Sequence, residues 1–172
     1  MKRILIATAF ALAVGPFAGI AGAYAHATLA QKEAPAGKRY KAVMTISHGC
    51  EGTATHTVRI QIPPGVMRTK PMPKPGWSLK TVVSKLEKPY KYHDRMITED
   101  VSELVWSGGN LPDNFFDEFE FRAILPKSAG KTLYFKTVQE CEKGVHRWIE
   151  IPEPGKSSRD YKEPAPALIL TF

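Results

Sequence analysis

Apolar and polar residues alternate along much of this chain, which is the pattern of β-strands that bury one face. The clearest alternation covers residues 40–46, 58–62 and 119–125. Further short β-rich runs cover residues 133–138, 147–151 and 168–172, with weaker periodicity at 78–86 and 101–106. Because no long segment has a 3.6-residue apolar period, the pattern predicts about eight short strands in an all-β fold, a single antiparallel β-sandwich.

The first residues have the features of a secretory signal peptide. Lys2 and Arg3 form a basic start, residues 4–14 form an apolar run, and residues 23–25 (Ala-Tyr-Ala) are a small-x-small cleavage site. Cleavage after this site would leave residues 26–172 as one mature domain, periplasmic or secreted. No later apolar run approaches the ~20 residues that a membrane-spanning helix needs, so we expect a protein that does not span the membrane.

The charged residues give the chain a basic balance, with 24 Lys and Arg against 17 Asp and Glu and a formal net charge of +7. The cations are scattered, and Lys70, Lys74, Lys80 and Lys85 stand among proline, glycine and apolar residues. Nucleic-acid-binding proteins concentrate positive charge in a patch, so we expect no nucleic-acid partner. A solvated basic surface accounts for the composition.

The chain contains two cysteines, Cys50 and Cys141. An exported protein meets an oxidising compartment, where an even pair of cysteines usually forms a disulfide. The alternative is a pair of thiolate copper ligands, but no C-x-x-C spacing supports it. We therefore expect a disulfide between these two residues.

Signal cleavage would make His26 the first residue of the mature protein. A terminal histidine can bind one metal ion through two nitrogens, its free α-amine and its ring Nδ1, which an internal histidine cannot do. Such a chelate, completed by oxygen donors, suits tetragonal Cu(II), which also heads the affinity order of the divalent first-row metals. The alternative is an incidental histidine that frays in solvent.

Two carboxylates are candidate oxygen ligands for this metal. Glu51 follows Cys50 in a glycine-flanked turn that the disulfide would fix, although an ordinary exposed glutamate is the alternative. Glu118 precedes the apolar Phe119 in a predicted strand, so its side chain would point away from the core. The alternative is an ordinary solvated strand residue. Trp148 comes shortly after Cys141, so the disulfide would bring it near Glu51, as a core residue or as an indole beside a metal.

The remaining histidines, His48, His56, His93 and His146, have no recognised metal-ligand spacing, although His48 borders the Cys50 turn. Catalytic motifs are absent from the sequence as well. It has no nucleophile elbow, no phosphate-binding glycine loop and no H-E-x-x-H segment. We therefore expect a protein that is not an enzyme.

Several short motifs occur in a characteristic order. They are His26-Ala27-Thr28-Leu29, His48-Gly49-Cys50-Glu51-Gly52, Ile62-Pro63-Pro64-Gly65-Val66, Lys74-Pro75-Gly76-Trp77, Phe116-Asp117-Glu118-Phe119, Gln139-Glu140-Cys141 and Trp148. In this order, across essentially the whole mature chain, the sequence resembles the YcnI-like family of exported copper-binding domains. It departs from the family members that lack the cysteine pair.

The resemblance implies an immunoglobulin- or cupredoxin-like β-sandwich with a mono-histidine brace for Cu(II). His26 matches the brace histidine and Trp148 the tryptophan close to the metal. Glu51, or else Glu118, matches the carboxylate that adds an oxygen. The implied function is a copper chaperone or buffer that exchanges Cu(II) with another exported or membrane copper protein.

Other functions fit parts of the sequence. A lytic polysaccharide monooxygenase-like copper enzyme also begins with a braced histidine, but it needs a second histidine, for which His48, His56 or His146 are candidates. A metal-free interaction sandwich is a further alternative, in which His26 is incidental. A CopC-like protein, whose mature chain also begins His-Ala, is a related copper-binding alternative.

Overall fold

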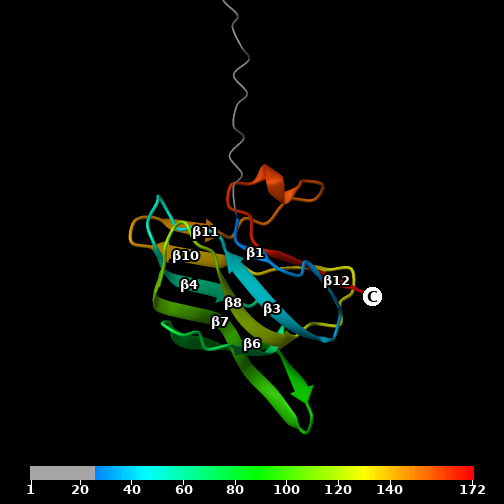
Figure 1. The fold of residues 1–172 in the computed structure, drawn as a ribbon. Coiled ribbons are helices and arrows are strands. Elements are labelled where there is room, and N and C mark those ends of the chain that lie inside the picture. Colours follow the sequence, from blue (N-terminus) through cyan, green and yellow to red (C-terminus); the bar gives the residue numbers. More distant parts are fainter. Residues whose placement is uncertain (1–25) are drawn as a thin grey trace, which may run out of the picture.

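The structure is a computed structural model that describes residues 26–172, and β-strands dominate it (Figure 1). The predicted signal peptide, residues 1–25, lies outside the described residues. Within residues 26–172, the one helical element is a 3-10 turn, η1 (Ser158–Asp160). None of the described residues forms a helix long and apolar enough to cross a membrane. The predicted all-β fold is therefore confirmed.

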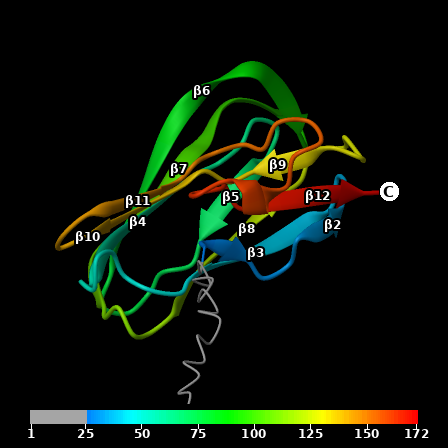
Figure 2. The same ribbon diagram turned by 90° about the horizontal axis from the view of Figure 1, so that it is seen from above.

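Two antiparallel sheets form the sandwich, and Figure 2 shows the larger one curving over the smaller. The four-stranded sheet has the order β1 (Thr28–Leu29), β3 (Arg39–Ile46), β8 (Asp117–Ile124), β5 (Met67–Pro71). The five-stranded sheet has the order β11 (Val145–Trp148), β10 (Thr137–Cys141), β4 (Thr55–Gln61), β7 (Arg95–Leu111), β6 (Ser78–Tyr92).

A smaller third sheet contains the one departure from antiparallel pairing among the described strands. Its order is β2 (Glu33–Pro35), β12 (Ala167–Thr171), β9 (Thr132–Tyr134). The last strand, β12, pairs with β9 in antiparallel fashion but with β2 in parallel. This sheet joins the start and the end of the described chain.

The core lies between the inward faces of the sheets, and the predicted alternation is confirmed there. In β3, Tyr40, Ala42, Met44 and Ile46 are all buried, while the residues between them are exposed or half-buried. Aromatic rings fill the space between the layers. Trp106 of β7 packs edge-on against Phe119 of β8 with ring centroids 5.5 Å apart, and Phe121 packs against Phe135 at 5.7 Å. Burial of each such ring stabilises the fold by roughly 1.5–3 kcal/mol.

The β6–β7 hairpin is much longer than its periodicity predicts. The two strands have 15 and 17 residues, and their far ends project beyond the sandwich (Figure 1). Along this extension both faces of the hairpin meet solvent, so its residues show no clear apolar alternation. The strand pairing continues there to Tyr92 and Arg95 without a buried face.

Candidate metal site

The first described residues are fixed to the edge of the four-stranded sheet. Thr28 pairs with Thr45 and Leu29 with Met44, while the side chains of Ala27 and Leu29 are buried. His26 stands directly before this anchored segment and is itself half-buried. A histidine at this position is therefore held against the sandwich.

Trp148 lies at the centre of a group of imidazole rings. It ends β11, is 4% exposed, and its ring centroid lies 5.6 Å from that of His26 in an edge-on arrangement. His48 approaches the indole edge-on at 6.1 Å, and His146 stacks on it at 4.8 Å. The rings of His48 and His146 are 5.3 Å apart and perpendicular. We call these four residues the histidine cluster.

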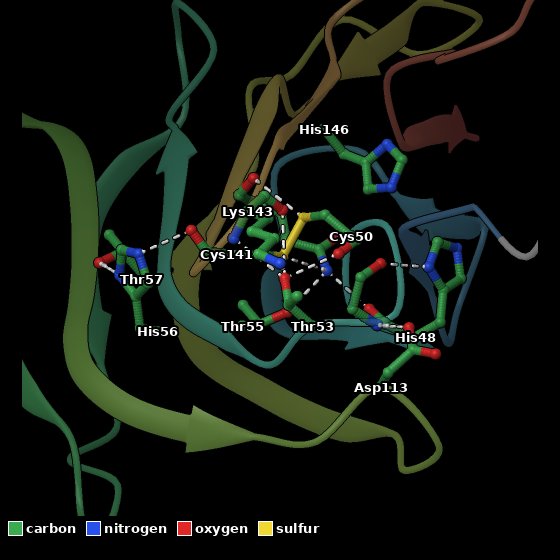
Figure 3. The surroundings of a disulfide bond; sticks show 12 residues. His48, Cys50, Thr53, Thr55, His56, Thr57, Asp113, Cys141, Lys143 and His146 are labelled. Atoms are coloured by element: carbon green, nitrogen blue, oxygen red, sulfur yellow. Dashed lines mark hydrogen bonds between the residues drawn. A yellow bond between two sulfur atoms is a disulfide. The ribbon is translucent and has the colours of Figure 1, made fainter.

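His48 belongs to a tightly constrained turn (Figure 3). The backbone N–H of Gly49 donates to Oδ1 of Asp113 at 2.9 Å, and Cys50 and Thr53 exchange backbone hydrogen bonds. A Cβ on Gly49 would lie 1.8 Å from the carbonyl oxygen of Thr53, so only glycine fits there. The turn therefore holds its first residue, His48, in a defined place.

The predicted disulfide is present between Cys50 and Cys141, with Cα atoms 5.7 Å apart. Both cysteines are buried. The bond fastens the His48 turn to the end of β10, whose neighbour β11 carries His146 and Trp148. It therefore brings together ligand candidates that lie far apart in sequence.

Gln139 is a buried residue that links the His48 turn to Trp148, a role that the sequence did not predict. Its Nε2 donates to the carbonyl oxygen of His48 at 2.6 Å and to Thr55 Oγ1 at 2.7 Å, and its Oε1 accepts from Nε1 of Trp148 at 3.1 Å. The side chain is 1% exposed, so its amide must find such partners. The sequence signal for this role is a polar residue at a position of the strand that faces the core.

His146 has a carboxylate partner. Its Nδ1 donates to Oε1 of Glu163 at 2.8 Å, while the backbone N–H of Arg147 donates to Oε2 at 3.0 Å. Burial raises the pKa of Glu163, but these two hydrogen bonds, together with nearby positive charge, hold that pKa below its usual range. Because Nδ1 is bonded to Glu163, Nε2 is the ring nitrogen of His146 that remains for a metal ion. Metal-binding histidines commonly have such a carboxylate partner.

The two candidate carboxylates lie elsewhere. The Glu51 carboxylate lies against Gly144, in the turn at the opposite end of β11 from Trp148. The backbone of Glu51 is left-handed, with φ of 50°, and its side chain points toward Gly144. Glu118 is exposed on the outward face of β8, opposite Thr45. The structure thus brings Trp148 to His26 but does not bring either carboxylate to the indole.

Two histidines are remote from the cluster. Both ring nitrogens of His56 are bonded, Nδ1 to Thr57 Oγ1 at 2.9 Å and Nε2 to the carbonyl oxygen of Cys141 at 3.0 Å. Figure 3 shows His56 across the disulfide from His48. His93 lies at the tip of the β6–β7 hairpin, against Tyr92. Of the internal histidines, His48 and His146 are therefore the ones that face the indole.

Side chains alone do not make a complete metal site. Among residues 26–172, no three side chains of histidine, cysteine, aspartate or glutamate converge closely enough to hold a metal ion. If His26 were the mature N-terminus, it would supply two nitrogens by itself, one from its ring and one from its α-amine. One further imidazole from the histidine cluster would then complete a set of three nitrogens.

Comparison with known proteins identifies the family. The family described as Domain of unknown function (DUF1775) matches residues 26–170. The chain belongs to this family, which is the YcnI family. The match begins at His26, the residue that follows the predicted cleavage site. Family and fold are both compatible with an exported domain.

A solved structure shares the fold of this DUF1775 protein. It is an uncharacterized protein from Nocardia farcinica, described as having an immunoglobulin-like fold. It is 20% identical, the alignment covers 86% of this chain and 99% of that one, and the TM-score is 0.64. The predicted immunoglobulin-like sandwich is therefore confirmed. No curated protein matches the chain.

Proposed function

We propose that this protein is an exported Cu(II)-binding protein that holds the ion at the histidine cluster and acts as a copper chaperone or buffer. One observation carries the proposal: three imidazoles, those of His26, His48 and His146, surround Trp148. His26 would offer its α-amine and a ring nitrogen after cleavage behind Ala25. The site would therefore form only in the processed protein, in the periplasm or outside the cell.

We infer that an imidazole, of His48 or of His146, completes the chelate rather than a carboxylate. His48 and His146 contact each other and the indole, whereas the Glu51 carboxylate lies against Gly144. Imidazole is a good ligand for copper, and a nitrogen-rich set is favoured by Cu(II). The hydrogen bond from His146 to Glu163 would fix its tautomer and leave Nε2 for the metal.

The surroundings suit reversible capture of a cargo ion. Trp148 is buried and held by Gln139, so the indole shields one side of the cluster from water. His26, His48 and His146 are each half-buried, so the opposite side stays open to solvent and to another copper protein. An open rim with a rigid base fits hand-over of the ion to an exported or membrane acceptor.

Substitution of the two groups of candidate ligands tests the donor set. We expect His48→Gln and His146→Gln, in the mature protein, to weaken Cu(II) binding and to reduce the nitrogen couplings in the Cu(II) electron paramagnetic resonance spectrum. Glu51→Gln and Glu118→Gln should change neither. His56→Gln is the matched histidine control, because both of its ring nitrogens are already bonded. Loss of binding in Glu51→Gln, with full binding in both histidine variants, would contradict the imidazole set.

A copper monooxygenase of the lytic polysaccharide type is a second candidate function. The observation that favours it is the second histidine that such enzymes need, which the cluster offers in His48 and His146. Oxidised sugars released from chitin or cellulose, in the presence of copper and a reductant, would establish this activity. Copper binding without such products favours the chaperone or buffer.

A further inference from the structure

A row of three cations crosses the outward face of the four-stranded sheet. Arg122 of β8 pairs with Lys41 of β3 on one side and with Lys70 of β5 on the other. Neighbouring strands lie about 4.8 Å apart, so the three side chains start close together. Like charges placed directly opposite each other destabilise a sheet. Glu120 pairs with Lys41 at 2.6 Å, whereas Arg122 and Lys70 make no ion pair among residues 26–172.

These two cations line a pocket with two more. Arg39, Arg68, Lys70 and Arg122 surround a cavity of about 210 Å³, and Tyr92 of the projecting β6–β7 hairpin forms one wall. No carboxylate lines it. Within residues 26–172, none of these four cations makes an ion pair. Four positive charges therefore face one small space whose lining contains no carboxylate.

Arg68 is held at this pocket in an unusual backbone conformation. Its φ of 55° is left-handed, which is unfavourable for a residue with a side chain. The backbone N–H of Arg68 donates to Oδ2 of Asp100 at 2.8 Å, and its guanidinium lies 4.8 Å from the centre of the Tyr92 ring. Backbone strain of this kind clusters at ligand-binding positions. Here it fixes a cation against the pocket wall.

We propose that this pocket binds an anion that carries a phosphate group. Three of the four cations are arginines, whose planar guanidinium matches the oxygens of a phosphate with paired hydrogen bonds. Four positive charges around a pocket with no carboxylate in its lining fit a doubly charged phosphate better than a single carboxylate. The phosphate could belong to a free compound or to a lipid headgroup, since both present the same oxygens.

This site is separate from the histidine cluster. β3 runs from Arg39, at the pocket, to Ile46, shortly before His48, so the two sites lie at opposite ends of one strand. The seven steps from Arg39 to Ile46, at ~3.3 Å each, span roughly 23 Å. The phosphate proposal therefore does not depend on copper binding.

Binding measurements with two sources of phosphate test the proposal. We would titrate the protein, in phosphate-free buffer of low ionic strength, with inorganic phosphate and pyrophosphate by calorimetry. In parallel, it would be sedimented with vesicles of phosphatidylglycerol or, as a neutral comparison, phosphatidylcholine. Binding of the soluble anions would identify a free compound as the source. Binding of phosphatidylglycerol vesicles alone would identify the headgroup.

Two pocket variants and one matched control decide whether the pocket is responsible. We expect Arg39→Gln and Arg122→Gln each to weaken binding at least tenfold. Arg159→Gln removes the same charge from an exposed position on η1, outside the pocket, and should keep binding within twofold. Thermal unfolding of each variant would confirm that it is folded. Absence of binding to every probe, or equal loss in Arg159→Gln, would overturn the proposal.

Discussion

The indole Nε1 of Trp148 donates a 3.1 Å hydrogen bond to Oε1 of Gln139. The same buried amide donates from Nε2 to the carbonyl oxygen of His48. One side chain thus fixes both the ring at the base of the histidine cluster and the turn at its edge. The shape of the cluster is therefore coupled to the packing of the core.

Replacement of Gln139 should show this coupling. Gln139→Leu would leave the Trp148 N–H and the His48 carbonyl without their partner, so we expect a loss of about 2–4 kcal/mol in the free energy of unfolding. Gln61→Leu, at an exposed position at the end of β4, is the control and should change it by less than about 0.5 kcal/mol. Urea unfolding measures both. Equal stability of the two variants would show that the buried amide does not hold the cluster.

The disulfide should contribute a large share of the stability. Cys50 and Cys141 are separated by 91 positions, and closing a loop of that length is expected to stabilise the fold by about 4–5 kcal/mol. We expect the double variant Cys50→Ser and Cys141→Ser to lose that amount in urea unfolding. Reduction of the native protein serves as the control and should give a similar loss. A loss below about 1 kcal/mol in both would exclude this role.

Tyr40 should make the fold sensitive to alkali. It is buried on β3, its hydroxyl donates to the carbonyl oxygen of Gln31 at 2.9 Å, and burial raises its pKa to about 12. The unfolded chain releases this proton near the ordinary value of 10.0, so the folded state binds more protons above it. The stability from Tyr40 is therefore complete below pH 10 and declines between pH 10 and 12.

The variant Tyr40→Phe isolates this effect. Burial, and next its hydrogen bond to Asp100, also raise the pKa of Tyr90. Tyr90 is present in both proteins, so its effect cancels in the comparison. We expect unfolding free energies, measured from pH 8 to 12, to fall less steeply above pH 10 in Tyr40→Phe than in the native chain. Parallel curves over that interval would contradict the assignment.

The sequence predicts those parts of the fold where one face of a strand is buried. β3 and β8 alternate clearly because Met44 and Phe119 face the core while Lys41 and Arg122 face solvent. The outer part of the β6–β7 hairpin was missed because neither face is buried, so alternation carries no signal there. The cation row was missed too, because its members come from three strands and meet only through register.

The candidate site shows a similar division. The resemblance to the YcnI family pointed to His26 and Trp148, and their rings are in contact. His48 and His146 were left without support because no short spacing connects them; the disulfide and the β10–β11 pairing bring them together. Glu51 was chosen for its place in the turn, but a local backbone angle, invisible in the sequence, accompanies its position beside Gly144.

The central claim is that copper binds through the mature N-terminus, and extending that terminus by one residue tests it most directly. Cu(II) affinity would be measured for the protein that begins at His26 and for the same protein with one alanine added before it. The addition keeps every side chain but moves the free amine away from the imidazole. We predict one tightly bound Cu(II) in the first protein and at least about tenfold weaker binding, or about 1.4 kcal/mol, in the second. Equal affinities would contradict the account.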